Sequence, residues 1–441
     1  MKSAGGALYL MVHNKEHVRL KSINRVMFVL NPLAIGGMET LCLYLADEYR
    51  RRGIQVGVVI PESDYLDPLA DMFSNCDVAV TRLDTDPRSG RWVQFLHLSK
   101  LAINLHKWHP DVVHLHTGAY GGVGVAVVTR ILSNATVVVT EHDIPVPRPP
   151  IYDRIGRYLL DRLVHALVSV SRRNAGLRRR RLRNVTSRTA TVLNGTPLRV
   201  VTSAESLENR TRIRRELGIG DQTVVIGSLV RLAPGKGLHD LIQAFARLKQ
   251  RDCRLVIVGD GELRDELQDL VRRLDICASV HIPGFHPDPA PFLDAFDVFV
   301  LAVPSGSMSI ALLEAMDRGL PPVITFGGPE EAVIPEVTGL VAPPSDPAGL
   351  AQALQRLVDD PALRRRLGAA AAEHVRCHYS IGRVADDLLE LYAGARAGRI
   401  PARLRSDGPP DPFPGRRRSQ QAASLTAQTA DTHANAMGPL D

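Results

Sequence analysis

The stretch TVVIGSLVRLAPGKGL, Thr223–Leu238, holds in one short segment the features that decide the fold. It opens with an apolar run of strand-like density and continues into a turn that contains Arg231, Lys236 and Gly237, where a new helix is predicted to begin. A buried strand, a glycine-containing turn and a helix in immediate succession form the repeating unit of a parallel sheet with helices on both faces.

Ten short apolar runs, separated by amphipathic helical stretches, extend this pattern along most of the chain. They begin at Arg25, Ile54, Asp111, Thr136 and His165, and then at Thr223, Arg254, Ser279, Asp297 and Pro321. Runs that are apolar on both faces and separated by helices indicate parallel strands covered on both sides. Two such sets in succession predict an α/β fold with two doubly wound, Rossmann-like domains.

Changes in composition give the domain boundaries. Residues 1–23 contain one short, interrupted apolar patch, so we expect an N-terminal extension and not a signal peptide. The turn-forming NGTP and the polar TSAESLENR indicate a join near Asn194–Glu208, which divides the chain into domains at 24–200 and 201–379. The segment 396–441 is rich in proline, arginine and glutamine, and we expect it to be disordered.

The composition bounds the class of protein. The 441 residues are 45% hydrophobic, which suffices for two domains with cores, and no apolar run approaches the roughly 18 to 20 residues that span a bilayer. The five cysteines lie far apart and form no CxxC pair. This pattern favours a reduced, cytoplasmic chain without a disulfide framework or a zinc site.

The net charge of +7 is concentrated in one segment. Residues 151–190 hold eleven arginines and two aspartates, so this segment alone carries +9. A solvated face, a surface for anionic lipid head groups and a nucleic-acid contact are the open interpretations. Because no aromatic residues are interleaved and no binding module is recognised, we expect no nucleic-acid partner.

In doubly wound sheets, ligands bind at the carboxyl ends of the strands, so the loops there are the candidate sites. Gly36 and Gly37 follow the first strand and precede a helix, a position at which backbone amides can approach an anion. This is not GxGxxG, so a nicotinamide cofactor is not supported. In the second half, Arg231 and Lys236 suit a diphosphate. That loop is not a phosphate-binding Walker A loop, because Gly237 stands where the pattern needs serine or threonine.

The stretch PSGSMSIALLEAM, Pro304–Met316, is a second candidate site. Backbone amides at Gly306, Ser307 and Ser309 precede a helix and could face a phosphate. The single charge, Glu314, lies about a turn inside that helix, where a carboxylate is costly to bury without a partner. A vicinal diol such as a ribose could supply that partner.

The order of the motifs resembles the family 4 retaining glycosyltransferases of the GT-B fold. The similarity covers about Arg25 to Leu391 and includes GGxE, PDVVHLHT, TEHD, SVSR, NG, GSLVRLAPGKG, LVIVGDGELRDEL, LLEAMDRGLPPVI and EVTGLVAPPSDPAGLAQAL. The resemblance implies two Rossmann-like domains that face each other across a cleft. The first would take the acceptor and the second the nucleotide-sugar donor, and a helix at 380–395 would pack back on the first domain.

The resemblance also implies roles for individual residues. Arg231 and Lys236 would hold the donor diphosphate and stabilise the charge on the leaving phosphate, so that no catalytic metal is needed. Glu314 would bind the ribose, and His142 would approach the donor sugar. The other predicted donor-site positions are Gly36, Gly37, Gly259, Gly284, Phe285, Gly306, Ser307, Met308 and Ser309, and the acceptor-side candidates are His114, His116 and Asp143.

The sequence departs from the family pattern in two places. The family signature has two glutamates with seven residues between them, and the first of these falls on Gly306. The family's first glutamate usually contacts the donor sugar, so its loss puts the donor or the transfer itself in question. Asp317 replaces a small residue of the motif, which we expect to change only a helix surface.

The resemblance therefore predicts a retaining glycosyltransferase of polysaccharide biosynthesis. It would use a nucleotide-diphosphate sugar, on family preference a UDP-sugar, and no cofactor. The acceptor would be a glycan, a lipid-linked sugar or a small molecule. The protein would be cytoplasmic and peripheral at the inner face of the membrane, with the basic segment 151–190 on anionic lipid. The alternatives are a degenerate nucleotide- or glycan-binding relative, which Gly306 favours, and a nucleotide-sugar epimerase. A phosphorylase is disfavoured because no convincing pyridoxal phosphate lysine is found.

Overall fold

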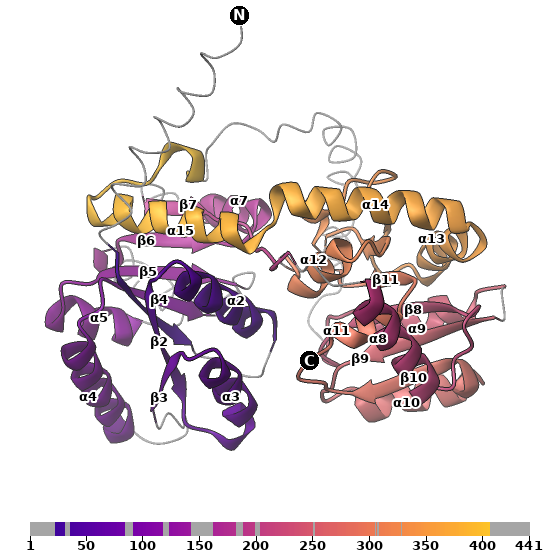
Figure 1. Ribbon diagram of the computed structural model, residues 1–441, viewed down its shortest axis with the longest axis horizontal. Coiled ribbons are helices and arrows are strands. Elements are labelled where there is room, and N and C mark those ends of the chain that lie inside the picture. The colour runs from indigo at the N-terminus through magenta and orange to yellow at the C-terminus, as the bar shows by residue number, and fades with distance from the viewer. Residues whose placement is uncertain are drawn as a thin grey trace, which may run out of the picture. The chain divides into compact units, whose positions relative to one another are not determined.

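Two parallel sheets organise the chain (Figure 1). The computed structural model describes residues 23–30, 36–83, 91–117, 123–142, 162–181, 188–198, 203–249, 252–304, 306, 308–327 and 329–405. The first sheet has the strand order β3-β2-β1-β4-β5-β6-β7, and all neighbouring strands pair in parallel. Its strands are β1 (Arg25–Leu30), β2 (Gln55–Pro61), β3 (Ala79–Leu83), β4 (Val112–Thr117), β5 (Thr136–Glu141), β6 (Ala166–Ser169) and β7 (Thr189–Thr191).

The second sheet has the order β10-β9-β8-β11-β12-β13 and is also parallel throughout. Its strands are β8 (Val224–Leu229), β9 (Cys253–Val258), β10 (Val280–Gly284), β11 (Val298–Leu301), β12 (Pro322–Thr325) and β13 (Leu340–Ala342). The ten predicted runs all form strands, and the two doubly wound α/β domains are confirmed. β3, β7 and β13 were not predicted, because these strands are short or half exposed and lack a dense apolar run.

Helices follow the strands in both domains. The first domain contains α2 (Gly37–Arg51), α3 (Asp67–Asn75), α4 (Arg91–Trp108), α5 (Val123–Leu132), α7 (Arg172–Arg181) and the short η1 (Asp64–Leu66). The second contains α8 (Ser203–Glu216), α9 (Leu238–Ala246), α10 (Arg264–Arg273), α11 (Ala290–Ala295), α12 (Ile310–Asp317), α13 (Pro347–Asp359), α14 (Pro361–His378), η3 (Cys277–Ser279) and η4 (Glu330–Ala332). Aspartate caps with proline in the first turn define the starts of α13 and α14, since Asp346 and Asp360 each accept two backbone N–H groups.

Both faces of the first sheet are buried, as continuous apolar runs require. Along β1, Phe28 and its alternate neighbours face a cluster that includes α2, whereas Met27 and Val29 face a second cluster with β4 and α4. Two further clusters cover the faces of the second sheet. The carboxyl ends of the central strands are therefore held on a packed scaffold.

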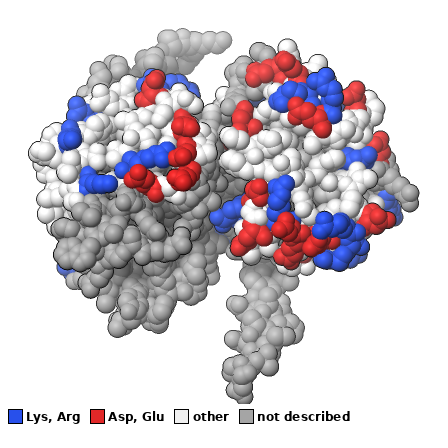
Figure 2. Space-filling view, turned by 90° about the horizontal axis from the view of Figure 1, so that it is seen from below, with Lys and Arg blue, Asp and Glu red and all other residues white. Residues whose placement is uncertain are grey.

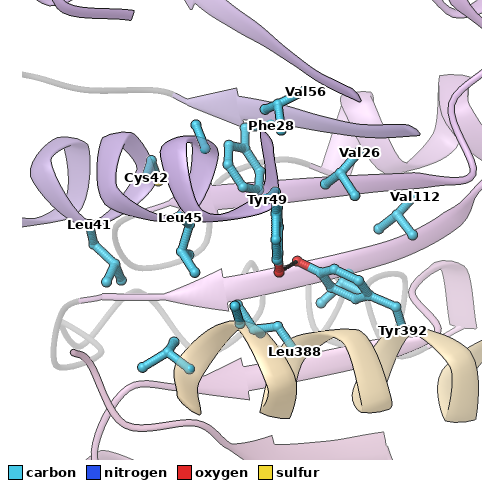
Figure 3. Packing of buried hydrophobic residues seen from close by; sticks show 14 of the residues in the cluster. Val26, Phe28, Leu41, Cys42, Leu45, Tyr49, Val56, Val112, Leu388 and Tyr392 are labelled. Atoms are coloured by element: carbon cyan, nitrogen blue, oxygen red, sulfur yellow. Dashed lines mark hydrogen bonds between the residues drawn. The ribbon is translucent and has the colours of Figure 1, made fainter. Parts of the chain in front are cut away.

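The C-terminal helix α15 (Ile381–Arg396) packs on the first domain, although α14 before it belongs to the second. Figure 3 shows Leu388 and Tyr392 of α15 facing Tyr49 and Leu45 of α2. At the crossing, the chain around Thr196 pairs with the chain around Ser380 through backbone hydrogen bonds of 2.9 Å. Both connections between the domains therefore run together, and η5 (Ala402–Leu404) follows α15.

Candidate active site

The loop after β8 carries the two cations predicted for a diphosphate. Arg231 is exposed and Lys236 is half-buried, and both lie at the carboxyl end of a central strand. Gly237 begins α9 in the left-handed conformation (φ 67°), and a Cβ atom there would lie 1.9 Å from the carbonyl oxygen of Ala302. Glycine is therefore required at this position to bring the loop against the end of β11.

The loop after β9 is tied to this cationic loop. The Leu232 N–H donates to the Asp260 carbonyl at 2.9 Å, and the Leu263 N–H donates to the Leu232 carbonyl at 3.0 Å. Gly259 (φ 145°) lies so close that a Cβ atom would stand 2.0 Å from the carbonyl oxygen of Val230. This packing by itself accounts for glycine at 259, so its predicted contact with the donor stays a prediction.

The start of α12 is built from local contacts. Ser309 is the N-cap, and its hydroxyl accepts a hydrogen bond from the Leu312 N–H at 3.3 Å. Met308 is buried, and its carbonyl accepts from the Asn194 side-chain amide at 2.8 Å. The Gly306 N–H donates to the Gly327 carbonyl at 3.3 Å. Ser307, like Asp143, lies outside the described residues.

Glu314 has a partner in the structure. It lies on α12 with 9% of its surface exposed, and its carboxylate accepts a hydrogen bond from the hydroxyl of Tyr44 on α2. Tyr44 was not predicted as a site residue, because a tyrosine beside the apolar stripe of an amphipathic helix does not by itself indicate a polar contact. A ribose at Glu314 would have to share this carboxylate with the phenol or displace it.

The glycine pair after β1 also lies beside α12. Gly36 precedes α2, and its N–H donates to the buried carboxylate of Glu39 at 2.8 Å. A Cβ atom on Gly37 would lie 3.7 Å from Ile310 of α12. The first turn of α2 therefore carries its own acidic partner at its positive end.

The end of β10 presents an exposed aromatic ring. Gly284 (φ 99°) accepts a hydrogen bond from the Gly259 N–H at 2.9 Å, which links the ends of β9 and β10. Phe285 follows with 46% of its surface exposed. An exposed ring beside a backbone edge can support a planar base, and this role remains a prediction for both residues.

Three histidines cluster at the carboxyl ends of β4 and β5. His114 and His116 lie on β4, and His142 follows β5. The Nδ1 atom of His116 lies 3.0 Å from Nε2 of His142, and these two rings stack with 5.3 Å between their centroids. The two ring nitrogens of His114 contact the hydroxyls of Tyr392 and Thr140, each at 2.7 Å.

Burial keeps these imidazoles neutral. It lowers the pKa of both His114 and His142 to about 3, and the nearby His142 adds to the effect on His114. Burial also lowers the pKa of His116 well below its usual range, and His114 and His142 contribute further. Within the described residues, no group of three or more His, Cys, Asp or Glu side chains could hold a metal ion, and the three clustered histidines therefore do not form such a group.

A second group of residues surrounds Gly306. A small cavity there is lined by Ser171, Arg173, Gly306, Met308, Pro329, Glu330 and Glu331. The Glu331 carboxylate accepts the backbone N–H groups of Arg172 and Arg173 at 2.9 and 2.7 Å, and so caps the start of α7. The Arg173 guanidinium donates to the Gly327 carbonyl. These contacts could not be predicted from the sequence, because they join segments more than 150 residues apart.

One expectation was wrong. We expected Asp317 to change only a helix surface, but its side chain is buried, with the nearest guanidinium atom, Nε of Arg376, at 3.8 Å. α12 packs against α14 over this face, so the last turn of α12 is covered. The expectation rested on the motif, in which a small residue stands at this position, and the motif does not show that α14 covers it.

Comparison with known proteins agrees with this architecture. Residues 35–199 match the family described as Glycosyltransferase Family 4, and residues 209–374 match Glycosyl transferases group 1. HepE of Anabaena, solved in complex with UDP and glucose, aligns with a TM-score of 0.72 at 20% identity and covers 83% of this chain and 98% of its own. WaaG, a glycosyltransferase involved in lipopolysaccharide biosynthesis, aligns with a TM-score of 0.61 at 17% identity over 82% of this chain and 99% of its own.

These likenesses establish the GT-B fold. The chain belongs to the family 4, group 1 glycosyltransferases. Its relatives include the lipopolysaccharide core biosynthesis glycosyltransferase LpsE of Rhizobium meliloti, 34% identical over 41% of this chain and 53% of that protein. The alpha-D-kanosaminyltransferase of Streptomyces kanamyceticus is 31% identical over 43% of this chain and 50% of that protein. The matched segments span about half the length of these curated relatives.

Proposed function

We propose that this chain is a retaining glycosyltransferase that moves a hexose-type sugar from a nucleotide-diphosphate donor, a UDP-sugar, to a glycan, lipid-linked or small-molecule acceptor. The observation that carries the proposal is the pair Arg231 and Lys236 in the loop after β8. Two cations at the carboxyl end of a central strand match a diphosphate in charge and position. The complex of the neighbour HepE with UDP and glucose supports the choice of base.

In the proposed reaction, the acceptor hydroxyl oxygen bonds to the anomeric carbon while the bond from that carbon to the diphosphate oxygen breaks. The hydroxyl proton leaves with the diphosphate, and attack on the face from which the phosphate departs retains the configuration. Negative charge builds up on the departing diphosphate, where Arg231 and Lys236 stabilise it. Glu314 would bind the ribose, and His142 would contact the sugar from the first domain.

A thermal-shift panel tests the donor site. The purified chain is heated with UDP, GDP, ADP, dTDP and their common sugar conjugates, and the Arg231→Ala variant serves as the control. A ligand that binds only the folded state raises the unfolding midpoint. We expect a selective rise with UDP and one UDP-sugar that the variant loses. The absence of a shift with every nucleotide would contradict the proposal and favour a degenerate relative, with Gly306 as the first position to examine.

We further propose that the enzyme is cytoplasmic and contacts an anionic membrane through its basic segment 151–190. In the part of the chain that the structure describes, no helix is long and apolar enough to cross a membrane. On the face of the molecule in Figure 2, the acidic and basic side chains of the described residues are interspersed. The described part of this face therefore has no large area of one charge. α7 lies within the basic segment, but Arg173 at its start is turned towards Gly327. The Arg188 guanidinium likewise donates to the Val164 carbonyl at 3.0 Å, so we propose the run 178–181 for lipid contact.

Flotation with liposomes tests this contact. We expect recovery with vesicles that contain anionic lipid, little recovery with neutral vesicles, and loss of binding at high salt because the attraction is screened. Equal recovery on both kinds of vesicle would contradict a charge-driven contact. Arginine-to-glutamine changes in the run 178–181 are expected to weaken binding, and the same changes at exposed arginines of α10 form the matched control.

A further inference from the structure

The two histidines of β4 have different surroundings. Both nitrogens of His114 have hydroxyl partners, on α15 and on β5, and the Tyr392 hydroxyl in turn lies 3.4 Å from that of Tyr49 (Figure 3). His114 is therefore a fully satisfied part of the core. In contrast, His116 has one described partner, Nε2 of His142. Its own Nε2 is buried, with no hydrogen-bond partner among the described residues.

This difference restricts where the protons lie. A neutral imidazole has one N–H and one acceptor nitrogen, so in the pair His116 Nδ1 and His142 Nε2 one atom must donate and the other accept. If His142 donated, Nε2 of His116 would be a buried N–H without an acceptor. If His116 donates, Nε2 of His116 is a bare lone pair. Orphaned buried N–H groups are rarer in native proteins than under-satisfied acceptors, so the second arrangement is favoured.

We propose that His116 is a positioning residue that donates its Nδ1–H to Nε2 of His142 and thereby holds His142 in the tautomer with its proton on Nδ1. The tautomer itself is independent of the proposed function, and only its consequence for sugar transfer rests on that function. In this tautomer Nδ1 of His142 carries a proton, so that this nitrogen cannot act as a base. The two ring planes lie within 29° of each other, so both rings can keep their nitrogens in line for this hydrogen bond, and a rotation of either ring would break it.

The packing around His116 supports a fixed orientation. Its ring meets Phe28 edge-on at 5.2 Å and lies 4.1 Å from the ring of His114. Only 1% of its surface is exposed, so solvent does not compete for Nδ1. His142 is 8% exposed at the end of β5, where a ligand at the strand ends would meet it.

The direct test is the tautomer of His142 in the full chain labelled with 15N-histidine. The His142 signals are identified by their absence in His142→Gln, and long-range 1H–15N correlations then report which ring nitrogen carries the proton. We expect the proton on Nδ1 in the free wild-type protein. A proton on Nε2 would overturn the proposal. This readout does not depend on activity, so a protein that transfers no sugar but shows the expected tautomer would contradict the proposed function alone.

A pair of variants gives the kinetic test. The side-chain amide of asparagine can occupy the place of the histidine Nδ1 atom, whereas that of glutamine reaches the place of Nε2. In His116→Gln the proton of His142 should no longer be held on Nδ1. We expect this variant to lower kcat by about 2- to 10-fold, the contribution of one hydrogen bond. His116→Asn is expected to keep the tautomer and to retain several-fold more kcat than His116→Gln. Equal kcat in the two variants, with the His142 tautomer unchanged in both, would show that His116 serves packing alone.

Discussion

The two domains place opposite kinds of chemistry at equivalent ends of their sheets. After β4 and β5, the first domain has neutral imidazoles and hydroxyls that are buried and bonded to one another. After β8, the second domain has an exposed arginine and a half-buried lysine on a glycine-shaped loop. The first arrangement is held together by hydrogen bonds between neutral groups, whereas the second brings two cationic side chains into one loop. Similar architectures can thus carry a buried cluster of neutral histidines in one domain and a cationic loop in the other.

The pH dependence of stability should distinguish the histidine cluster of the first domain most clearly from the cationic loop of the second. The unfolded chain protonates its histidines near pH 6.5, whereas His114 and His142 stay neutral in the folded state down to about pH 3. Below about pH 6 the unfolded state therefore binds more protons, and the free energy of unfolding falls by about 1.4 kcal/mol per pH unit for each such histidine. Urea unfolding at several pH values measures this slope.

His114→Gln is the variant for this test, and exposed His106→Gln is its control. His114→Gln should reduce the slope of the unfolding free energy against pH by about 1.4 kcal/mol per pH unit, the contribution of one histidine. His106→Gln should leave this slope unchanged. An unchanged slope in His114→Gln would mean that this imidazole is not held neutral by the fold.

The cationic loop should dominate catalysis. Arg231→Ala or Lys236→Ala is expected to slow transfer by about two to three orders of magnitude, as for the loss of one preorganised group that stabilises charge. Because Arg231 is exposed, the unfolding midpoint of Arg231→Ala without ligand should stay near that of the wild type. Arg247→Ala, at an exposed position just after α9, is the matched control. Unchanged activity in either loop variant would refute the diphosphate assignment.

The hydrogen bond between Tyr44 and Glu314 joins α2 of the first domain to α12 of the second. Changes at this contact should have a smaller effect than changes in the cationic loop. Glu314→Ala should weaken UDP binding by about 10- to 100-fold, the usual worth of hydrogen bonds to a charged group. Tyr44→Phe removes the phenol that occupies this carboxylate, and should tighten UDP binding by about two- to five-fold. Calorimetric titration with UDP measures both. If Glu314→Ala bound UDP as tightly as the wild type, the ribose assignment would be wrong.

The smallest effect is expected at Gly306. Its backbone is not left-handed, and a Cβ atom would lie 3.3 Å from Cγ1 of Val303, so Gly306→Ala should cost about 1 kcal/mol or less in stability. Gly306→Glu should cost more, because Glu330 and Glu331 line the same cavity. Gly306→Glu should change the ranking of UDP-sugars in the thermal-shift panel and leave the shift with UDP alone nearly unchanged. The alanine variant should change neither. A lower shift with UDP itself would place Gly306 at the nucleotide and not at the sugar.

Much of the scaffold could be predicted from the sequence because parallel strands buried on both faces need continuous apolar runs. All ten such runs form strands, and the turn before α9 shows its glycine as expected. The edge strands β3, β7 and β13 were missed because an edge strand pairs on one side only and needs less apolar surface. The loops after β1 and β8 were recognised as candidate sites from their place after a strand, whereas the histidines of β4 and β5 were predicted from the family resemblance alone.

The sequence by itself determined the two doubly wound domains and the cationic loop of the second, because strand periodicity and turn chemistry are local. Only the tertiary structure decided the partners: Tyr44 for Glu314, Tyr392 for His114, His142 for His116 and Glu331 for the start of α7. It also decided that Asp317 is covered. Hydrogen-bond partners of buried polar groups come from segments distant in the chain, and local spacing carries no information about which of them the packing brings together.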